Sequence, residues 1–124
     1  MKATTFLVFF SVALCCTSAI RGQTIDWVRQ LGTSSGDHSS GVSADGLGNV
    51  YISGITSGTL SGDYFNNKAD AFVSKFDANG NRLWIQQFGT DESDEVLGVS
   101  ADGLGNVYLS GNTHGSLGSL NEGS

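Results

Sequence analysis

GVSADGLGNVYISG, residues Gly41–Gly54, returns almost unchanged as GVSADGLGNVYLSG, residues Gly98–Gly111. The likeness extends beyond these stretches, because WVRQLGT beginning at Trp27 matches WIQQFGT beginning at Trp84. The spacing of the two tryptophans gives a repeat period of 57 residues. A period of this size is typical of repeat architectures such as solenoids and propellers, which stack similar units side by side. The repeat therefore indicates the architecture of the chain, although it says nothing about chemistry.

The composition fits about one domain of short strands and tight turns. The chain has 124 residues, with 18 glycines and no proline, so glycine, Asn and Asp are expected to form its turns. Its net charge of −6 argues against nucleic acid and anionic membrane surfaces as partners. No stretch after the first 22 residues shows an apolar period of 3.6, so we expect almost no helix.

The first 22 residues have the pattern of a secretory signal peptide. Lys2 supplies a positive charge, Phe6–Cys16 is an apolar run, and small residues follow it. We expect cleavage between about Ala19 and Gln23, and hence a secreted or cell-surface protein. A permanent membrane anchor is the weaker alternative, because the run is shorter than the roughly 20 apolar residues that span a bilayer.

Both cysteines lie in this leader. A lipoprotein anchor on Cys15 or Cys16 is a further alternative, weakened because Leu14 and Cys15 stand where a small residue should precede the modified cysteine. A cleaved chain would have no cysteine, which excludes disulfides, thiolate catalysis and cysteine-bound metal.

One period after the leader contains four predicted strands, which are Gly41–Asp45, Val50–Ser53, Ala71–Phe76 and Arg82–Phe88. In Val50–Ser53, Val50 and Ile52 alternate with Tyr51 and Ser53, and turns at Asp45–Asn49 and Ala78–Asn81 join the strands as hairpins. Thr24–Leu31 has the pattern of a leading strand. The loops between them are expected at Thr33–Ser39, Thr56–Ala69 and Thr90–Glu95. The small residues of Gly41–Asp45 suit a crowded inner strand that faces a propeller channel.

Four antiparallel strands in each repeat, joined by tight turns, are typical of a β-propeller blade. The motifs W-x-x-Q-x-G-T, G-V-S-A-D-G-L-G-N-V-Y, D-A-F-V-S-K-F-D and G-N-x-L-W follow one another in order over Trp27–Ser124. In this the chain resembles the bacterial seven-bladed β-propeller repeat family, often called SBBP repeats. The resemblance implies extracellular or cell-surface propeller proteins, mostly without a defined activity, and it brings no catalytic residues.

The fold class expected is therefore all-β, with one complete blade and a partial second one. Residues 23–124 form the repeat region, with copy one at about 27–83 and copy two at about 84–124. Copy two ends before its counterpart of DAFVSKFD, whereas a closed propeller needs at least about four blades. We expect the chain to be a fragment of a larger propeller; an assembling unit or a mis-called gene product is the alternative.

Candidate metal sites are weak in this sequence. Asp77–Asn81 resembles the start of a calcium loop, but Arg82 and Phe88 stand where an EF-hand needs glycine and glutamate. The DGLGN turns at Asp45 and Asp102 could hold a hard cation, yet Asp and Asn also serve tight turns. His38 and His114 occupy different repeat positions, so we expect exposed loop histidines rather than a zinc site.

The remaining candidates also favour structural roles. No serine lies in a G-x-S-x-G elbow. The acidic cluster of Asp91, Glu92, Asp94 and Glu95 is expected to be a solvated loop, with binding of cations or a basic partner as the alternative. The tryptophans at 27 and 84 are expected to pack between blades, although sugar-binding aromatics look similar.

These patterns predict a secreted, non-enzymatic propeller module without catalytic residues, metal or cofactor. Its expected partners are neighbouring blades, other copies of itself, or an extracellular protein or glycan bound by its loops. One alternative is part of a larger propeller enzyme whose active site lies in other blades, and another is a non-functional remnant.

Overall fold

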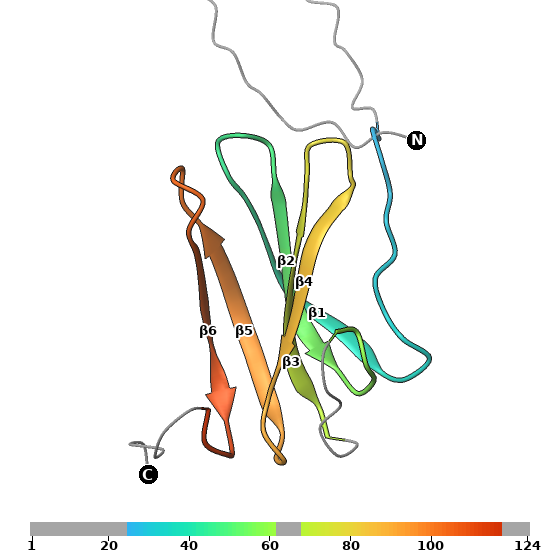
Figure 1. Ribbon diagram of the computed structural model, residues 1–124, viewed down its shortest axis with the longest axis vertical. Coiled ribbons are helices and arrows are strands. Elements are labelled where there is room, and N and C mark those ends of the chain that lie inside the picture. Colours follow the sequence, from blue (N-terminus) through green and yellow to red (C-terminus); the bar gives the residue numbers. More distant parts are fainter. Residues whose placement is uncertain (1–24, 62–67, 118–124) are drawn as a thin grey trace, which may run out of the picture.

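The computed structural model describes residues 25–61 and 68–117, and their regular structure is entirely β-strand. The strands are β1 (Asp37–Ala44), β2 (Val50–Thr56), β3 (Asp70–Phe76), β4 (Arg82–Phe88), β5 (Asp94–Ala101) and β6 (Val107–Thr113) (Figure 1). Among these described residues no helix is long and apolar enough to cross a membrane. The predicted signal peptide lies outside the described residues.

Strands β1 to β4 form one antiparallel sheet in chain order, which confirms the four-stranded sheet predicted from the sequence. We call this sheet the first blade. Strands β5 and β6 pair in a second sheet, which we call the half-blade. The two sheets repeat the same register, because Gly41 pairs with Ser53 and Gly98 pairs with Ser110. In both sheets the register shifts just before this glycine, Gly41 in the first blade and Gly98 in the half-blade.

Several predicted boundaries are wrong. β1 starts at Asp37 and β5 at Asp94, inside segments predicted as loops, and β1 ends before Asp45. The register shift between Ser39 and Gly41 allows the pairing of β1 with β2 to continue into the polar residues before Gly41. These residues do not alternate between apolar and polar.

β2 also runs past its predicted end at Ser53 and includes Thr56. Gly54 does not stop the strand. A Cβ at this position would clash with the His38 carbonyl and come within 2.8 Å of the Phe72 ring, so close packing requires the glycine.

The predicted leading strand at Thr24–Leu31 is also wrong over most of its length. Only Asp26 makes a strand bridge, and Thr24 lies outside the described residues. Side chains hold this segment against the β3–β4 hairpin instead: the Trp27 ring stacks on Phe76 with centroids 6.1 Å apart. We call residues 25–31 the leading segment.

The half-blade packs on one face of the first blade through β5, which contacts β1, β2 and β3. We call this the forward face of the first blade and its opposite side the rear face. Gly41 lies against Val99, and the Ser43 hydroxyl accepts a 3.0 Å hydrogen bond from the Ala101 amide. The predicted crowding at this small-residue strand is real. The crowding comes from β5 of the other sheet, which packs against β1. Within its own sheet β1 is an edge strand.

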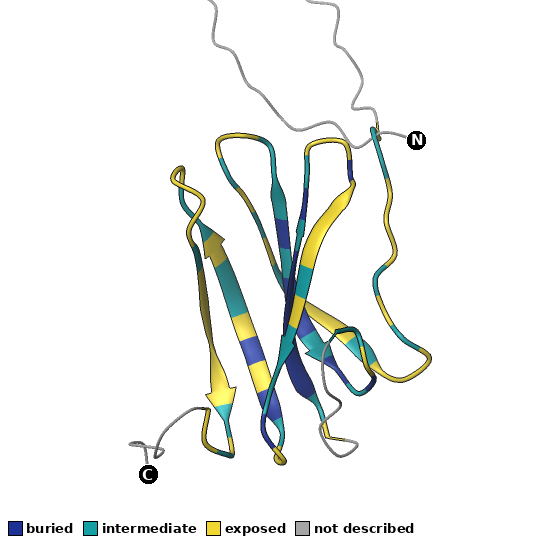
Figure 2. Ribbon diagram, in the orientation of Figure 1, coloured by how far each residue is buried: buried dark blue, intermediate teal, exposed yellow. Residues whose placement is uncertain are grey.

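The core lies in the first blade, where Tyr51, Ala71, Val73 and other residues of β2 and β3 are buried (Figure 2). The half-blade is mostly exposed apart from Asp94 and Val96. Burial in this molecule therefore follows the position of neighbouring sheets rather than the sequence of the repeat.

Candidate functional site

Three aspartates, Asp45, Asp77 and Asp102, hold the hairpin turns. They are the turn residues considered above as metal ligands. Asp45 Oδ1 accepts hydrogen bonds from the amides of Leu47 (2.9 Å) and Asn49 (3.0 Å). Its Oδ2 accepts bonds from Asn49 Nδ2 (2.7 Å) and the Tyr51 hydroxyl (3.1 Å). The carboxylate is thus surrounded by donors from its own hairpin.

The same arrangement recurs at Asp102 in the half-blade, with donors from Leu104, Asn106 and Tyr108 at 2.7 to 3.2 Å. At Asp77 the donors are the amides of Asn79 and Asn81 and the Asn81 side chain, so the hairpin reading of this segment is confirmed. Gly48, Gly80 and Gly105 take positive φ angles of 83°, 78° and 88° in these turns.

These donors lower the pKa of the turn aspartates. At Asp102 and Asp77 the side-chain hydrogen bond from the turn asparagine is the largest cause of the lowered pKa. At Asp45 desolvation raises the pKa, but hydrogen bonds from Asn49, Leu47 and Tyr51 outweigh it and leave the pKa below the usual aspartate value. The turns therefore favour ionised carboxylates.

A second motif, missed in the sequence, links a threonine to the aspartate four residues after it in both copies, and in the first blade a threonine of β2 also bonds this aspartate. The amide and hydroxyl of Thr33 donate to Asp37 Oδ2, and the Thr56 hydroxyl donates to Asp37 Oδ1. Desolvation raises the pKa of Asp37, and these bonds more than offset it, so the pKa is lowered. The signal for this motif was available, because the T-x-x-x-D spacing recurs at Thr90–Asp94.

In the half-blade this motif lies at the junction between the two sheets. The Thr90 amide and hydroxyl donate to Asp94 Oδ2, and the Asp94 amide donates to the Ala69 carbonyl at 2.8 Å. Asp94 is 1% exposed, so the prediction of a solvated loop is wrong at this residue. Gly89 makes room here, since a Cβ would come within 2.5 Å of Asp70 Oδ1 and 3.0 Å of Asp94 Oδ2.

The other acidic residues of the predicted cluster are exposed, as expected. Glu92 forms an ion pair with Lys68 at 3.7 Å, and Glu95 belongs to β5 rather than to a loop. Both partners of the ion pair are about half exposed, so it contributes little to stability.

The histidines do not come together at a site. His38 is exposed within β1, not in a loop, and His114 is exposed just after β6, where its ring contacts the Ser93 carbonyl. Within residues 25–61 and 68–117, no three His, Cys, Asp or Glu side chains are grouped to hold a metal ion.

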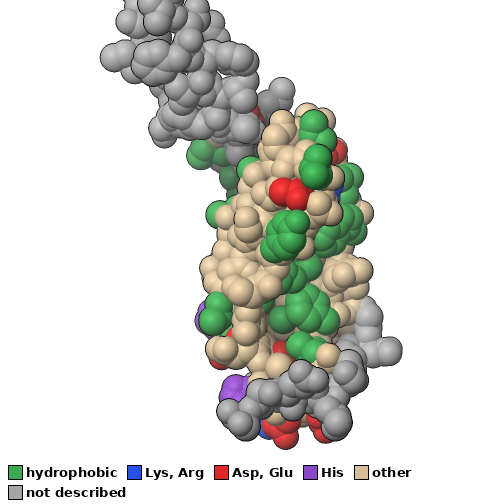
Figure 3. All heavy atoms as spheres, turned by 90° about the vertical axis from the view of Figure 1, so that its left-hand side faces the viewer, with side chains coloured by type: hydrophobic (Ala, Val, Ile, Leu, Met, Phe, Trp, Pro, Cys, Tyr) green, Lys and Arg blue, Asp and Glu red, His purple; other side chains and the backbone are tan. Residues whose placement is uncertain are grey.

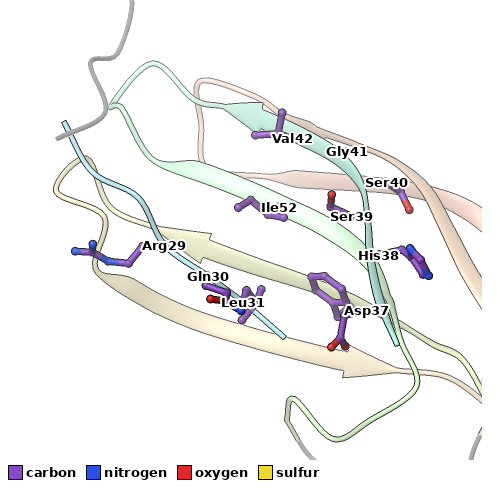
Figure 4. A pocket seen from close by; sticks show the side chains of 11 residues that line it. Arg29, Gln30, Leu31, Asp37, His38, Ser39, Ser40, Gly41, Val42 and Ile52 are labelled. Atoms are coloured by element: carbon purple, nitrogen blue, oxygen red, sulfur yellow. The ribbon is translucent and has the colours of Figure 1, made fainter. Parts of the chain in front are cut away.

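A groove of about 600 Å³ opens on the rear face of the first blade, between β1 and the leading segment (Figure 4). Its apolar lining includes Leu31, Val42, Ile52 and Phe72. On the far side of the leading segment, Arg29 Nε donates to the Gly80 carbonyl at 2.7 Å, a contact that the sequence did not suggest. The leading segment therefore covers the β3–β4 end of the rear face and leaves the β1–β2 end open.

Trp27 and Trp84 have different surroundings. Trp27 packs on the first blade, against Phe76, rather than between two blades, and its Nε1 donates to the Ala78 carbonyl at 3.2 Å. Trp84 contacts Tyr51 but remains 37% exposed on the forward face, so its predicted burial between blades is wrong. No described strand of the half-blade extends over it.

The half-blade exposes hydrophobic side chains along its side of the molecule (Figure 3). They are Leu97, Leu104, Tyr108, Leu109 and Leu117, with exposed fractions of 37% to 89%. Among the described residues β6 pairs only with β5, so its other edge is open. Leu109 and Leu117 line a small cavity against Ala71 and Phe88 of the first blade, whereas Tyr108 lies on the opposite face of the half-blade and is the candidate for an outward interaction surface.

Comparison with known proteins identifies the repeat. The SBBP family of beta-propeller repeats matches residues 26–60 and residues 83–118, which together make up more than half of the chain. The two matches coincide with the two copies of the repeat. No curated protein matches the chain. The chain therefore belongs to the SBBP beta-propeller repeat family.

Proposed function

We propose that this chain is a secreted, non-enzymatic propeller module that serves as a scaffold for binding protein. The exposed apolar side chains of the half-blade, Tyr108 among them, carry the proposal, because apolar side chains gathered on an exposed face commonly mark a binding site. Tyr108 is 59% exposed there, and tyrosine is among the side chains that contribute most to protein interfaces.

The chemistry of the described side chains supports a structural role over a catalytic one. The carboxylates that recur in both copies are engaged in hairpin turns and in the Thr–Asp motif. The pKa values of Asp37, Asp45, Asp77 and Asp102 are all lowered, whereas a general acid or base near neutral pH needs a raised carboxyl pKa. A surface glycan is the alternative ligand, and the apolar character of the half-blade favours protein.

Binding of the exported chain to bacterial envelope fractions tests this function. We expect binding that protease treatment of the envelope abolishes and glycosidase treatment leaves intact. Leu97→Ser/Tyr108→Ser should bind at least about tenfold more weakly, since both side chains are exposed. Leu47→Ser is the matched control, because Leu47 is 79% exposed on the Asp45 turn and should bind normally.

Two results would contradict the proposal. Binding that is lost with glycosidase but not with protease would assign the surface to glycans, and absence of binding to any fraction would remove the scaffold role. Export is checked separately by mass spectrometry, which should find an N-terminus between about Ala19 and Gln23. An exported chain that retains Met1 would contradict the signal peptide.

A further inference from the structure

The two sheets meet where an apolar side chain of the half-blade packs on a shallow site of the first blade. We call such a site a seat. The seat is on the forward face of the first blade and is formed by Gly41, Ser43, Tyr51 and Ser53, which we call the first seat. Val99 of β5 lies against Gly41, where a Cβ would come within 3.2 Å of a valine methyl. Tyr51 and Ser53 are 0% exposed under this contact.

The chain carries a second copy of this seat, and nothing in the described residues fills it. The register of the half-blade places Tyr108 opposite Ser100, and Ser110 opposite Gly98. These four residues, the second seat, lie on the face of the half-blade opposite to Val99, because side chains alternate along a strand. Tyr108 is 59% exposed, whereas its counterpart Tyr51 is fully buried.

The chain also carries a second copy of the apolar side chain. Val42 occupies the repeat position of Val99, and it pairs with Ile52 on the rear face of the first blade. Val42 is 69% exposed and lines the groove on that face (Figure 4). Within residues 25–61 and 68–117, two outer faces thus present the two unoccupied halves of an interface that the chain already forms within itself.

The leading segment fits the same arrangement. Its sequence WVRQL is the repeat counterpart of WIQQF in β4, which is the fourth strand of the first blade. It lies on the rear face, as the fourth strand of a preceding blade would, and the groove beside it is open. The half-blade supplies a first and a second strand.

We propose that this chain binds a second copy of itself head to tail, with Val42 of one copy in the second seat of the other. The proposal rests on the scaffold function above and names its protein partner. The half-blade of one copy then lies in the rear groove of the next, and the leading segment flanks it as the fourth strand of a composite blade. The described residues supply no third strand for that blade.

Head-to-tail contacts use two different surfaces, so they produce closed rings or open chains. The described residues of each copy supply one first blade and half of each of two composite blades, which amounts to two blades. Propellers close with roughly four to eight blades, so a closed ring would contain about two to four copies.

Sedimentation velocity of the purified chain, from about 1 to 200 µM, tests the proposal with two variants. Tyr108→Arg places a charge in the second seat, and Val42→Arg places one on the opposite surface. Each should weaken self-association at least about tenfold, because a charge buried in an interface without a partner is costly. Both side chains are mostly exposed, so neither change should unfold the protein; circular dichroism checks this.

The mixture of the two variants is decisive. Tyr108→Arg keeps an intact Val42 surface and Val42→Arg keeps an intact second seat, so an equimolar mixture should form a one-to-one complex that grows no further. Leu47→Arg is the matched control. Leu47 is 79% exposed, and its repeat counterpart Leu104 stays 89% exposed beside the existing junction, so this variant should associate like the unmodified chain.

An unmodified chain that remains monomeric at 200 µM would overturn self-association, and envelope binding would then show whether the scaffold function survives with another partner. Self-association at full strength in Tyr108→Arg or Val42→Arg would also overturn the proposal. So would a mixture that forms no complex.

Discussion

Gly41–Gly54 and Gly98–Gly111 differ at one position, yet the first stretch contains fully buried residues whereas the second contains none and is mostly exposed. Tyr51 is 0% exposed and Tyr108 is 59% exposed, although the hydroxyl of each donates to the aspartate of its own turn. The hairpins, their registers and their turn hydrogen bonds are the same in both. The repeat sequence thus determines the hairpin, and the neighbouring sheets determine what is buried.

For the two repeat-related valines the difference in exposure is reversed, with the first copy exposed. Val42 is 69% exposed on the rear face of the first blade, whereas Val99 is partly covered by that blade. Each copy therefore has one covered face and one open face, which is the expected condition of repeats that bury their surfaces only against neighbours.

Replacing the two tyrosines by alanine should give the largest difference between the copies. Tyr51→Ala removes a fully buried ring that contacts Trp84, and should lower the free energy of unfolding by about 3–5 kcal/mol. Tyr108→Ala removes a mostly exposed ring and should cost less than about 1 kcal/mol. Urea unfolding measures both values. Equal costs would contradict the difference in burial.

Turn glycines should show the opposite behaviour, with similar effects in both copies. Gly48→Ala and Gly105→Ala place a side chain at a positive φ, which should cost about 1–2 kcal/mol each in urea unfolding. Gly46→Ala and Gly103→Ala are controls, because a Cβ at either position meets nothing within 4 Å and neither φ is positive. A Gly105→Ala variant as stable as its control would mean that the second turn is not formed as described.

Lowering the pH should destabilise both turns, and this effect should be the smallest of the three. The pKa values of Asp45 and Asp102 are lowered, so folding favours their ionised forms. This stabilisation is present above the unfolded aspartate pKa of about 3.9, and it is lost as the pH falls through the lower folded pKa. Carboxyl carbon shifts in an NMR titration should place both midpoints below about 3.9. A midpoint above this value at either residue would contradict the hydrogen bonding of that turn.

Local features of the fold were predictable because short-range chemistry produces them. The alternation in Val50–Ser53 and the Asp-Gly-Leu-Gly-Asn turns predicted the strands, the order of the sheet and the hairpins. Features that depend on a neighbouring sheet were not predictable from the local pattern. Asp94 is buried because Ala69 and Gly89 of adjacent segments surround it, and its local sequence reads as an acidic loop.

The candidate binding surfaces were predictable only in part. Nothing in the local pattern distinguishes Tyr108 from Tyr51, since exposure depends on which face has a neighbour. The groove beside Leu31 and Val42 depends on how the leading segment crosses the rear face, and this position is fixed by the side chains of Trp27 and Arg29 rather than by strand pairing.

The most direct test of this account is whether Val99 lies in the first seat. NMR of the Tyr108→Arg variant, which should not self-associate, reports on contacts within one chain. We predict nuclear Overhauser effects from the Val99 methyls to the Gly41 α-protons, together with slow exchange of the Ala101 amide that donates to Ser43. If these effects are absent, and if Tyr51 is as accessible to solvent as it would be in an isolated hairpin, the half-blade does not pack on the first blade as described.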